Sequence, residues 1–140
     1  MYRCLIANRG EIAVRIIRAC REMDVETVAI YALGDETSLH VSLADQAICI
    51  GEANPLESYL NQDRIISAAK ISGATAIHPG YGFLSESTSF AQKVEENNID
   101  FIGPTQLTME MMGDKITARQ TVDDAGVPII PGSTNAVESI

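Results

Sequence analysis

The chain has 140 residues, of which 46% are hydrophobic, and this size and composition suit a single packed core. Its formal net charge is -9, from 19 acidic and 10 basic residues, which argues against nucleic acid and anionic membrane surfaces as partners. No stretch approaches the roughly 20 apolar residues of a membrane span, and the N-terminus lacks a signal-peptide pattern. We therefore expect a soluble, cytoplasmic protein.

Three cysteines, Cys4, Cys20 and Cys49, have no CxxC spacing and lie in apolar runs or on the apolar side of a helix. We expect them to be buried free thiols in a reducing compartment. The two histidines, His40 and His78, are too few and too isolated to predict a metal centre.

Short apolar runs alternate with amphipathic segments along the chain, which predicts βαβ units. The runs expected to form strands are residues 3–7, 27–32, 47–50, 74–77 and 100–103. The segments expected to form helices are residues 11–23, 39–44, 62–72, 87–97, 106–112 and 115–125. The fold class predicted from this alternation is α/β, with a Rossmann-like, open and mostly parallel sheet flanked by helices.

Capping residues mark several of these helices. Asn61 is a good N-cap and Gly73 a good stop for the segment between them, and Asp114 and Gly126 have the same roles for the last helix. After Pro128, a strand is expected to start at Ile129.

Ligands of open α/β sheets bind at the carboxyl ends of the strands, which here means the loops 8–10, 78–86 and 103–105. The first loop has one glycine and therefore lacks the three-glycine dinucleotide fingerprint. A tight structural turn is the simpler interpretation, and direct contact with a ligand is the alternative. In the second loop, Gly80 and Gly82 flank Tyr81, so the backbone can approach a ligand closely and the ring offers a flat face. A structural turn in which Tyr81 covers the core explains this pattern equally well.

Two further features are candidates for binding. Lys115 lies in the first turn of a helix, where a bound anion would offset an otherwise unfavourable cation; a solvated surface lysine is the alternative. The first helix carries Glu11, Arg15, Arg18 and Glu22 on one stripe, with opposite charges adjacent. Such a stripe is usually a solvated, salt-bridged face, and the alternative is a self-complementary dimer contact.

Several segments together resemble the biotin carboxylase family. Residues 6–13, Ile-Ala-Asn-Arg-Gly-Glu-Ile-Ala, resemble its opening, and residues 76–86, Ala-Ile-His-Pro-Gly-Tyr-Gly-Phe-Leu-Ser-Glu, resemble its signature loop. Further matching segments follow in the family's order, at 101–104, 112–115, 127–128 and 131–133. One departure is Ser87, where the family commonly has Asn; both residues can cap a helix, so the fold is unaffected.

The resemblance implies an ATP-dependent ligase that uses Mg-ATP and bicarbonate to carboxylate biotin on a carrier protein. It implies a Rossmann-like pre-ATP-grasp domain at residues 1–113 and the beginning of an ATP-grasp region at 114–140. It also implies that Lys115 is an ATP ligand and that Tyr81 and Gly82 lie near biotin. The stripe residues Arg15, Arg18 and Glu22 fall on a helix used at the bacterial dimer interface.

The same resemblance implies what this chain lacks. The glycine-rich phosphate loop, the carboxylates that hold Mg²⁺ and the basic residues for bicarbonate and biotin would lie beyond residue 140, so we expect no catalytic residue or metal ligand here. The isolated chain is expected to be inactive and to bind ATP, Mg²⁺ or biotin weakly at best. The full-length enzyme would form a homodimer and work with a biotin carboxyl carrier protein and a carboxyltransferase. Because the motif begins directly after Met1, we expect a bacterial acetyl-CoA carboxylase of fatty acid biosynthesis.

Two alternatives remain. Another ATP-grasp ligase would share the preceding Rossmann-like domain, although the loop at 78–86 is not expected there. A non-catalytic α/β binding or dimerisation module would fit the short length and the charged stripe on the first helix.

Overall fold

The structure of the protein is a computed structural model, which describes residues 2–113 and 115–130. The N-cap predicted at Asp114 and the segment 131–140 lie outside the described residues. The chain divides into two compact units, one ending at Gly103 and the other beginning at Pro104, and we describe each by itself.

The first unit is built on one parallel sheet. Its strands lie in the order β3-β2-β1-β4-β5, and every neighbouring pair is parallel. They are β1 (Arg3–Ile6), β2 (Glu26–Ala32), β3 (Gln46–Gly51), β4 (Ala76–His78) and β5 (Asp100–Phe101). The chain builds the sheet outward from β1 in one direction and then returns to add β4 on its other side, which is the Rossmann-type order. The predicted fold class is confirmed.

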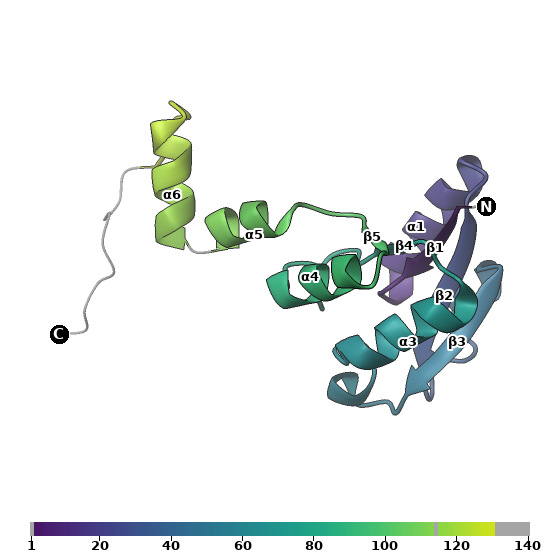
Figure 1. Cartoon of the computed structure of the whole chain (residues 1–140). Coiled ribbons are helices and arrows are strands. Elements are labelled where there is room, and N and C mark those ends of the chain that lie inside the picture. Colours follow the sequence, from purple (N-terminus) through teal and green to yellow (C-terminus); the bar gives the residue numbers. More distant parts are fainter. Residues whose placement is uncertain (1, 114, 131–140) are drawn as a thin grey trace. The chain divides into compact units, whose positions relative to one another are not determined.

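Helices cover both faces of this sheet (Figure 1). On one face lie α1 (Gly10–Glu22) and the short α2 (Leu39–Leu43), and on the other lie α3 (Gln62–Ser72) and α4 (Thr88–Glu96). A 3₁₀ turn, η1 (Pro55–Glu57), interrupts the loop before α3.

Strand β1 shows why two cores form. Successive side chains of a strand point to opposite faces. Leu5 therefore joins the core under α3 and α4, whereas Ile6 packs with Ala13 and Ile17 of α1. All four side chains are fully buried.

The caps of α3 and α4 agree with the sequence. Asn61 Oδ1 accepts a hydrogen bond from Arg64 N at 3.1 Å, and Gly73 ends α3 with a left-handed φ of 66°. Ser87 Oγ accepts one from Phe90 N at 3.2 Å, so serine caps α4. These predicted caps are confirmed.

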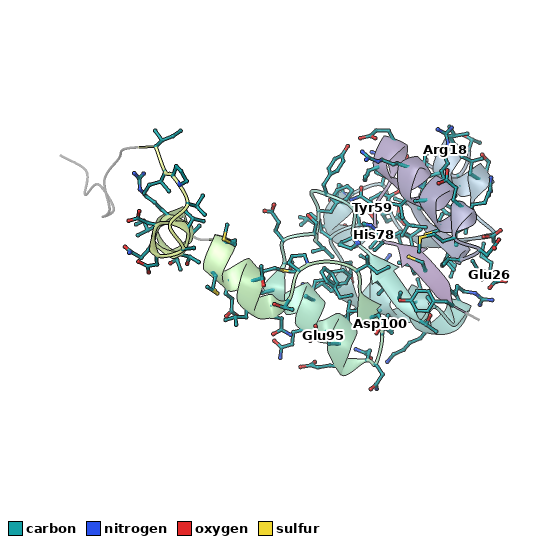
Figure 2. The ribbon with its side chains drawn as sticks, turned by 90° about the horizontal axis from the view of Figure 1, so that it is seen from above. Arg18, Glu26, Tyr59, His78, Glu95 and Asp100 are labelled. Carbon is teal, nitrogen blue, oxygen red and sulfur yellow. The ribbon has the colours of Figure 1, made fainter. Side chains whose placement is uncertain are left out.

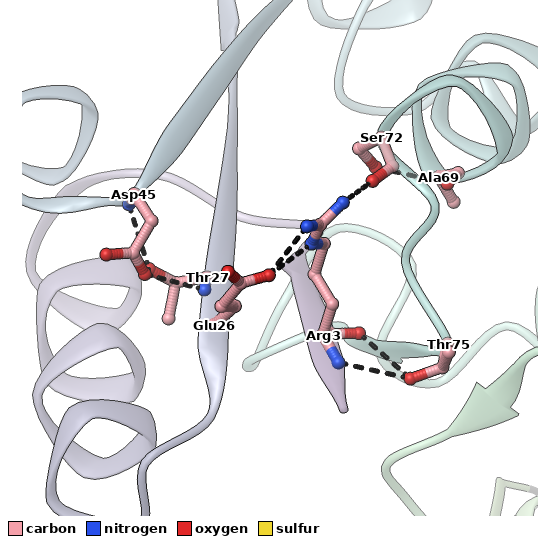
Figure 3. A network of polar contacts seen from close by, with 7 residues as sticks. All are labelled: Arg3, Glu26, Thr27, Asp45, Ala69, Ser72 and Thr75. Carbon is pink, nitrogen blue, oxygen red and sulfur yellow. Dashed lines mark hydrogen bonds and ion pairs between the residues drawn. The ribbon is translucent and has the colours of Figure 1, made fainter. Parts of the chain in front are cut away.

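A polar network joins four elements at the amino-terminal end of the sheet (Figure 3). The guanidinium of Arg3 on β1 lies 2.6 Å from the carboxylate of Glu26 on β2 and also donates to the carbonyl of Ser72 at the end of α3. Thr75, just before β4, accepts a hydrogen bond from Arg3 N at 3.2 Å. Nearby, Thr27 donates through N and Oγ1 to Asp45, at 2.8 and 2.7 Å. The network holds the beginnings of β1, β2 and β4 in register.

The cysteines only partly match the prediction of three buried thiols. Cys4 is buried, and burial raises the pKa of its thiol to about 12. Cys20 is half-buried and Cys49 is exposed. The prediction was wrong for Cys49: on the edge strand β3, Ile48 and Ile50 point into the core, whereas Cys49 points to the opposite face and stays exposed there.

The second unit contains α5 (Gln106–Gly113) and α6 (Lys115–Asp124). Thr105 Oγ1 accepts a hydrogen bond from Thr108 N at 3.3 Å and so caps α5. Gly126 has a φ of 72°, and Val127 N donates to the Val122 carbonyl at 2.9 Å, so the predicted stop of the last helix is confirmed. The strand predicted from Ile129 is not seen at residues 129 and 130, and its remainder lies outside the described residues.

Within the part of the chain that the structure describes, no helix is long and apolar enough to cross a membrane. The same residues contain no group of three histidine, cysteine or acidic side chains that could hold a metal ion.

The core under α4 gives a test of the packing. Phe90 is fully buried and meets Phe101 edge-on, with ring centroids 6.1 Å apart. We expect Phe90→Ala to lower the free energy of unfolding of the chain by about 3–5 kcal/mol, because it leaves a cavity. Chemical denaturation followed by circular dichroism measures this, with the exposed Gln92→Ala as a control expected to change stability by no more than about 0.5 kcal/mol. A loss below about 1 kcal/mol for Phe90→Ala would contradict this packing.

Candidate functional site

Two of the three predicted loops meet at the carboxyl ends of β1 and β4. These strands are neighbours in the sheet, and Ala7 N donates to the His78 carbonyl at 2.9 Å. The chain order reverses between them, and this switch point is where open α/β sheets hold their ligands. The third loop, 103–105, spans the junction of the two units, so it is described only within each of them.

Asn8 connects the two loops. Its side chain is buried, and Nδ2 donates to the carbonyls of Pro79 and Tyr81, at 2.8 Å each. Its Oδ1 accepts from Arg9 N at 2.9 Å. Gly80 has a φ of 67°, and a Cβ there would lie 2.9 Å from Asn8 Nδ2, so only glycine allows this approach.

Tyr81 projects away from the core. Its side chain is 59% exposed, whereas Leu84 in the same loop is buried. Of the two interpretations that the sequence left open, the one in which Tyr81 covers the core is therefore excluded, because Leu84 fills that place. Gly82 has a φ of 67°, but among the described residues nothing lies within 4 Å of where its Cβ would be. Glycine at 82 thus serves the backbone conformation, and apart from its chain neighbours the space around it is open.

A second cluster supports the loop from the other side. Tyr59 stacks on Phe83, with ring centroids 5.2 Å apart and an angle of 9° between the rings. Figure 2 labels Tyr59 and, close to it in that view, His78. The Tyr59 hydroxyl donates to Asp35 at 2.7 Å and accepts from Ala32 N at 3.1 Å. Arg9 pairs with Asp35 at 2.6 Å, and its guanidinium carbon lies 5.7 Å from the centre of the Tyr59 ring.

The sequence did not single out Tyr59 or Asp35. Tyr59 lies in a segment interpreted only as a loop, and Asp35 lies in a polar stretch before α2. The one signal in the sequence that could have marked Tyr59 was an aromatic residue within a polar, proline-containing loop. Together with Arg9 and Phe83 these residues line a small pocket of about 260 Å³.

Electrostatics keep this cluster in one protonation state near neutral pH. Partial burial alone would raise the pKa of Asp35, but the hydrogen bond from Tyr59 and the Arg9 guanidinium outweigh it and lower the pKa. Burial and the bond to Asp35 raise the pKa of Tyr59, so its hydroxyl stays a donor. Burial lowers the pKa of His78, whose Nδ1 accepts from Gly80 N at 3.0 Å. A neutral imidazole therefore helps to shape the loop.

The charged stripe on α1 lies apart from these loops. Its members Glu11, Arg15, Arg18 and Glu22 are exposed, and Figure 2 shows Arg18 on the outer side of the helix. They line a groove of about 820 Å³ between α1 and α2. Among the described residues, no ion pair joins members of the stripe, so the salt bridges expected for a solvated face are not formed there.

Lys115 is the first residue of α6, as predicted. The position of its side chain lies outside what the structure describes. Its predicted role as an ATP ligand therefore stays a prediction.

Comparison with known proteins identifies the family. The sequence model of the biotin carboxylase N-terminal domain matches residues 1–109. The chain belongs to the biotin carboxylase family. It is 55% identical to biotin carboxylase 1 of Bacillus subtilis over 136 residues, which cover 97% of this chain and 30% of that protein. The alternative of another ATP-grasp ligase is therefore set aside.

Solved structures of the family have the same fold. The biotin carboxylase–β-γ-ATP complex of Campylobacter jejuni superposes with a TM-score of 0.91 at 49% identity, over 96% of this chain and 30% of that one. The biotin carboxylase domain dimer of Hydrogenobacter thermophilus 2-oxoglutarate carboxylase, solved with MgADP, ADP and bicarbonate, gives 0.88 at 52% identity, over 94% and 29%. The chain thus spans about 30% of the length of the biotin carboxylases it matches, and corresponds to their N-terminal portion.

The Asp35 cluster gives a pH-dependent prediction. Because the folded protein lowers the pKa of Asp35, the carboxylate stabilises the fold above its unfolded pKa of about 3.9, and this contribution disappears as pH falls through the lower folded value. Asp35→Asn should therefore reduce the free energy of unfolding by about 1 kcal/mol at pH 7, and the difference from the unaltered chain should shrink below pH ~4. Denaturant titrations at several pH values measure it.

Asp63 offers a matched control. It also forms an ion pair, with Lys93 at 2.6 Å, but its side chain is 84% exposed. Asp63→Asn should change the free energy of unfolding by less than about 1 kcal/mol at pH 7. An equal loss for the two variants at pH 7 would show that the Asp35 cluster adds nothing beyond a surface ion pair.

Proposed function

We propose that this chain forms the N-terminal part of a cytoplasmic biotin carboxylase, which uses Mg-ATP and bicarbonate to carboxylate biotin on a carrier protein. The observation that carries the proposal is the loop at 78–86. It presents an exposed Tyr81 between two glycines at the switch point of the sheet, in a chain about half identical to biotin carboxylases along almost its whole length.

Within this function, Tyr81 and Gly82 form one wall of the biotin site. The aromatic face of Tyr81 offers a flat surface for a compact bicyclic ring. Gly82 adds no side chain beside it, and the space around its missing Cβ is open among the described residues. The two positions therefore suit a ligand that lies close to the backbone.

ATP binding is assigned to Lys115 in the first turn of α6. A cation at a helix N-terminus is favourable when phosphate oxygens bind there too, because the helix N–H groups and the ammonium then share the anion. When bound, Mg-ATP supplies the activation of bicarbonate. We assign the magnesium ligands and the catalytic groups to the remainder of the enzyme, since this chain spans about 30% of the biotin carboxylases it matches.

As the complex in which the enzyme works, we propose acetyl-CoA carboxylase of fatty acid biosynthesis, with a biotin carboxyl carrier protein and a carboxyltransferase as partners. Identity to the Hydrogenobacter 2-oxoglutarate carboxylase domain is 52%, close to the 55% with the Bacillus relative. Acetyl-CoA should therefore be tested directly against 2-oxoglutarate as the carboxyl acceptor in the assembled complex.

Bicarbonate-dependent ATP hydrolysis with free biotin tests the proposal. The full-length enzyme should turn over, and the isolated chain should not, because we assign the groups that hold Mg²⁺ and bicarbonate to the remainder of the enzyme. In the full-length enzyme, Tyr81→Ala should raise the KM for biotin about fivefold or more, since an aromatic stacking partner contributes roughly 1 kcal/mol or more to binding. Tyr2→Ala is a control at another exposed tyrosine, and it should leave this KM unchanged. Turnover by the isolated chain, or an unchanged KM for Tyr81→Ala, would contradict the assignment.

The α1 stripe is proposed as part of a two-fold contact with a second copy. It carries both signs of charge, is exposed and lines an open groove, so each copy can offer arginines to the glutamates of the other. The related Hydrogenobacter domain was solved as a dimer. A self-complementary surface also accounts for the absence of ion pairs within the stripe among the described residues.

Charge reversal tests this contact. Arg18→Glu should raise the dimer dissociation constant of the full-length enzyme at least about tenfold, because it places like charges opposite each other. The double variant Arg18→Glu/Glu22→Arg should recover much of the affinity if the two positions face each other across the axis. Analytical ultracentrifugation measures both variants, and a dimer unaffected by Arg18→Glu would exclude this surface.

A further inference from the structure

We infer that Asn8 is a positioning residue for biotin: it holds the loop at 78–86 through two backbone carbonyls and so sets where Tyr81 stands. The inference rests on the proposed function, in which Tyr81 contacts biotin. It adds a residue from a different strand end, whose own side chain is buried and does not meet the ligand.

The loop needs an external restraint because its backbone is unusual. Gly80 and Gly82 both have a φ of 67°, and Phe83 has a φ of 41°, a region that non-glycine residues seldom occupy. Pro79 has no N–H to donate. A segment with this conformation keeps one geometry only where its surroundings hold it.

Asn8 supplies that restraint with a fixed orientation. Arg9 N donates to Oδ1, which turns both protons of the amide toward the loop. There they meet the carbonyls of Pro79 and Tyr81, at 2.8 Å each. The side chain is buried, so water does not compete for these bonds, and each is worth more than an exposed one.

The loop is also held on the far side of Tyr81. Phe83 stacks on Tyr59, and the Tyr59 hydroxyl is bonded to Asp35 and to the Ala32 amide. The backbone is thus restrained at 79 and 81 by hydrogen bonds and at 83 by ring stacking.

Tyr81 depends on these restraints more than its neighbours do. Because Tyr81 is 59% exposed, few packing contacts fix its ring. The position of the ring therefore depends on the conformation of the backbone that carries it. A loop that is already held in its binding conformation loses less conformational entropy when the ligand binds, and it keeps the Tyr81 ring in one place. Loss of the Asn8 bonds should therefore weaken biotin binding specifically.

Asn8→Asp is the sharpest test because it changes the side chain by one atom. The acceptor for Arg9 N is kept, but an oxygen now opposes the two loop carbonyls. In the full-length enzyme, we expect the KM for biotin to rise about tenfold and the KM for ATP to stay unchanged. A tenfold rise corresponds to the loss of one to two buried hydrogen bonds. Lowering the pH protonates the new carboxyl, which can then donate one bond, so the ratio of variant to wild-type KM should fall.

Asn97 provides a matched control at the end of α4. Its amide also donates to a backbone carbonyl, that of Lys93, at 2.7 Å. Asn97→Asp makes the same chemical change away from the loop and should alter neither KM.

A second variant covers the case in which Asn8→Asp does not fold. Gly80→Ala pushes a methyl group against Asn8 Nδ2 from the loop side and should also raise the KM for biotin. Suppose that Tyr81→Ala raises the KM for biotin but a folded Asn8→Asp or Gly80→Ala enzyme has a normal one. That result overturns the role of Asn8 and leaves the proposed biotin contact of Tyr81 in place. A normal KM for Tyr81→Ala overturns the proposed biotin contact, and with it the role of Asn8.

Discussion

One buried amide organises the candidate site. The two protons of Asn8 reach from the end of β1 to the loop after β4, and join the two chain segments that meet at the switch point. The order of the strands brings these segments to the same place, but it does not determine how the second loop is shaped there. That shape depends on a hydrogen-bonding side chain, two left-handed glycines and a neutral histidine.

The two ends of the sheet have different roles. At the amino-terminal end, Arg3 and Thr27 connect strands and helix ends through side-chain bonds, and the chain connections there are short. At the carboxyl-terminal end, the loops are longer and expose Tyr81. The Arg3 network and the exposed Tyr81 therefore lie at opposite ends of the sheet. This division is general among open α/β folds.

Much of this was predictable from the sequence, because hydrophobic periodicity and capping residues are local signals. The five strands of the sheet, to within two residues at their ends, and the caps Asn61, Gly73 and Ser87 were predicted correctly. What failed depended on tertiary position. Cys49 was expected to be buried and is exposed, because it lies on the edge strand β3. The two interpretations of Tyr81 could not be separated from the sequence, because they depend on which loop side chain fills the core. The partnership of Tyr59 with Asp35 joins loops far apart in the sequence, and no local pattern marks it.

Because the three thiols differ in burial, a labelling reagent can be attached selectively to Cys49. Cys49 on the outer strand is accessible, Cys20 is half-covered, and Cys4 is enclosed with its ionisation suppressed. Thiolates, not thiols, react with maleimides and similar reagents, so labelling should favour one position under mild conditions. A fluorophore placed there would sit on strand β3, outside the loops that carry Asn8 and Tyr81. The domain could then be followed spectroscopically with its native sequence intact.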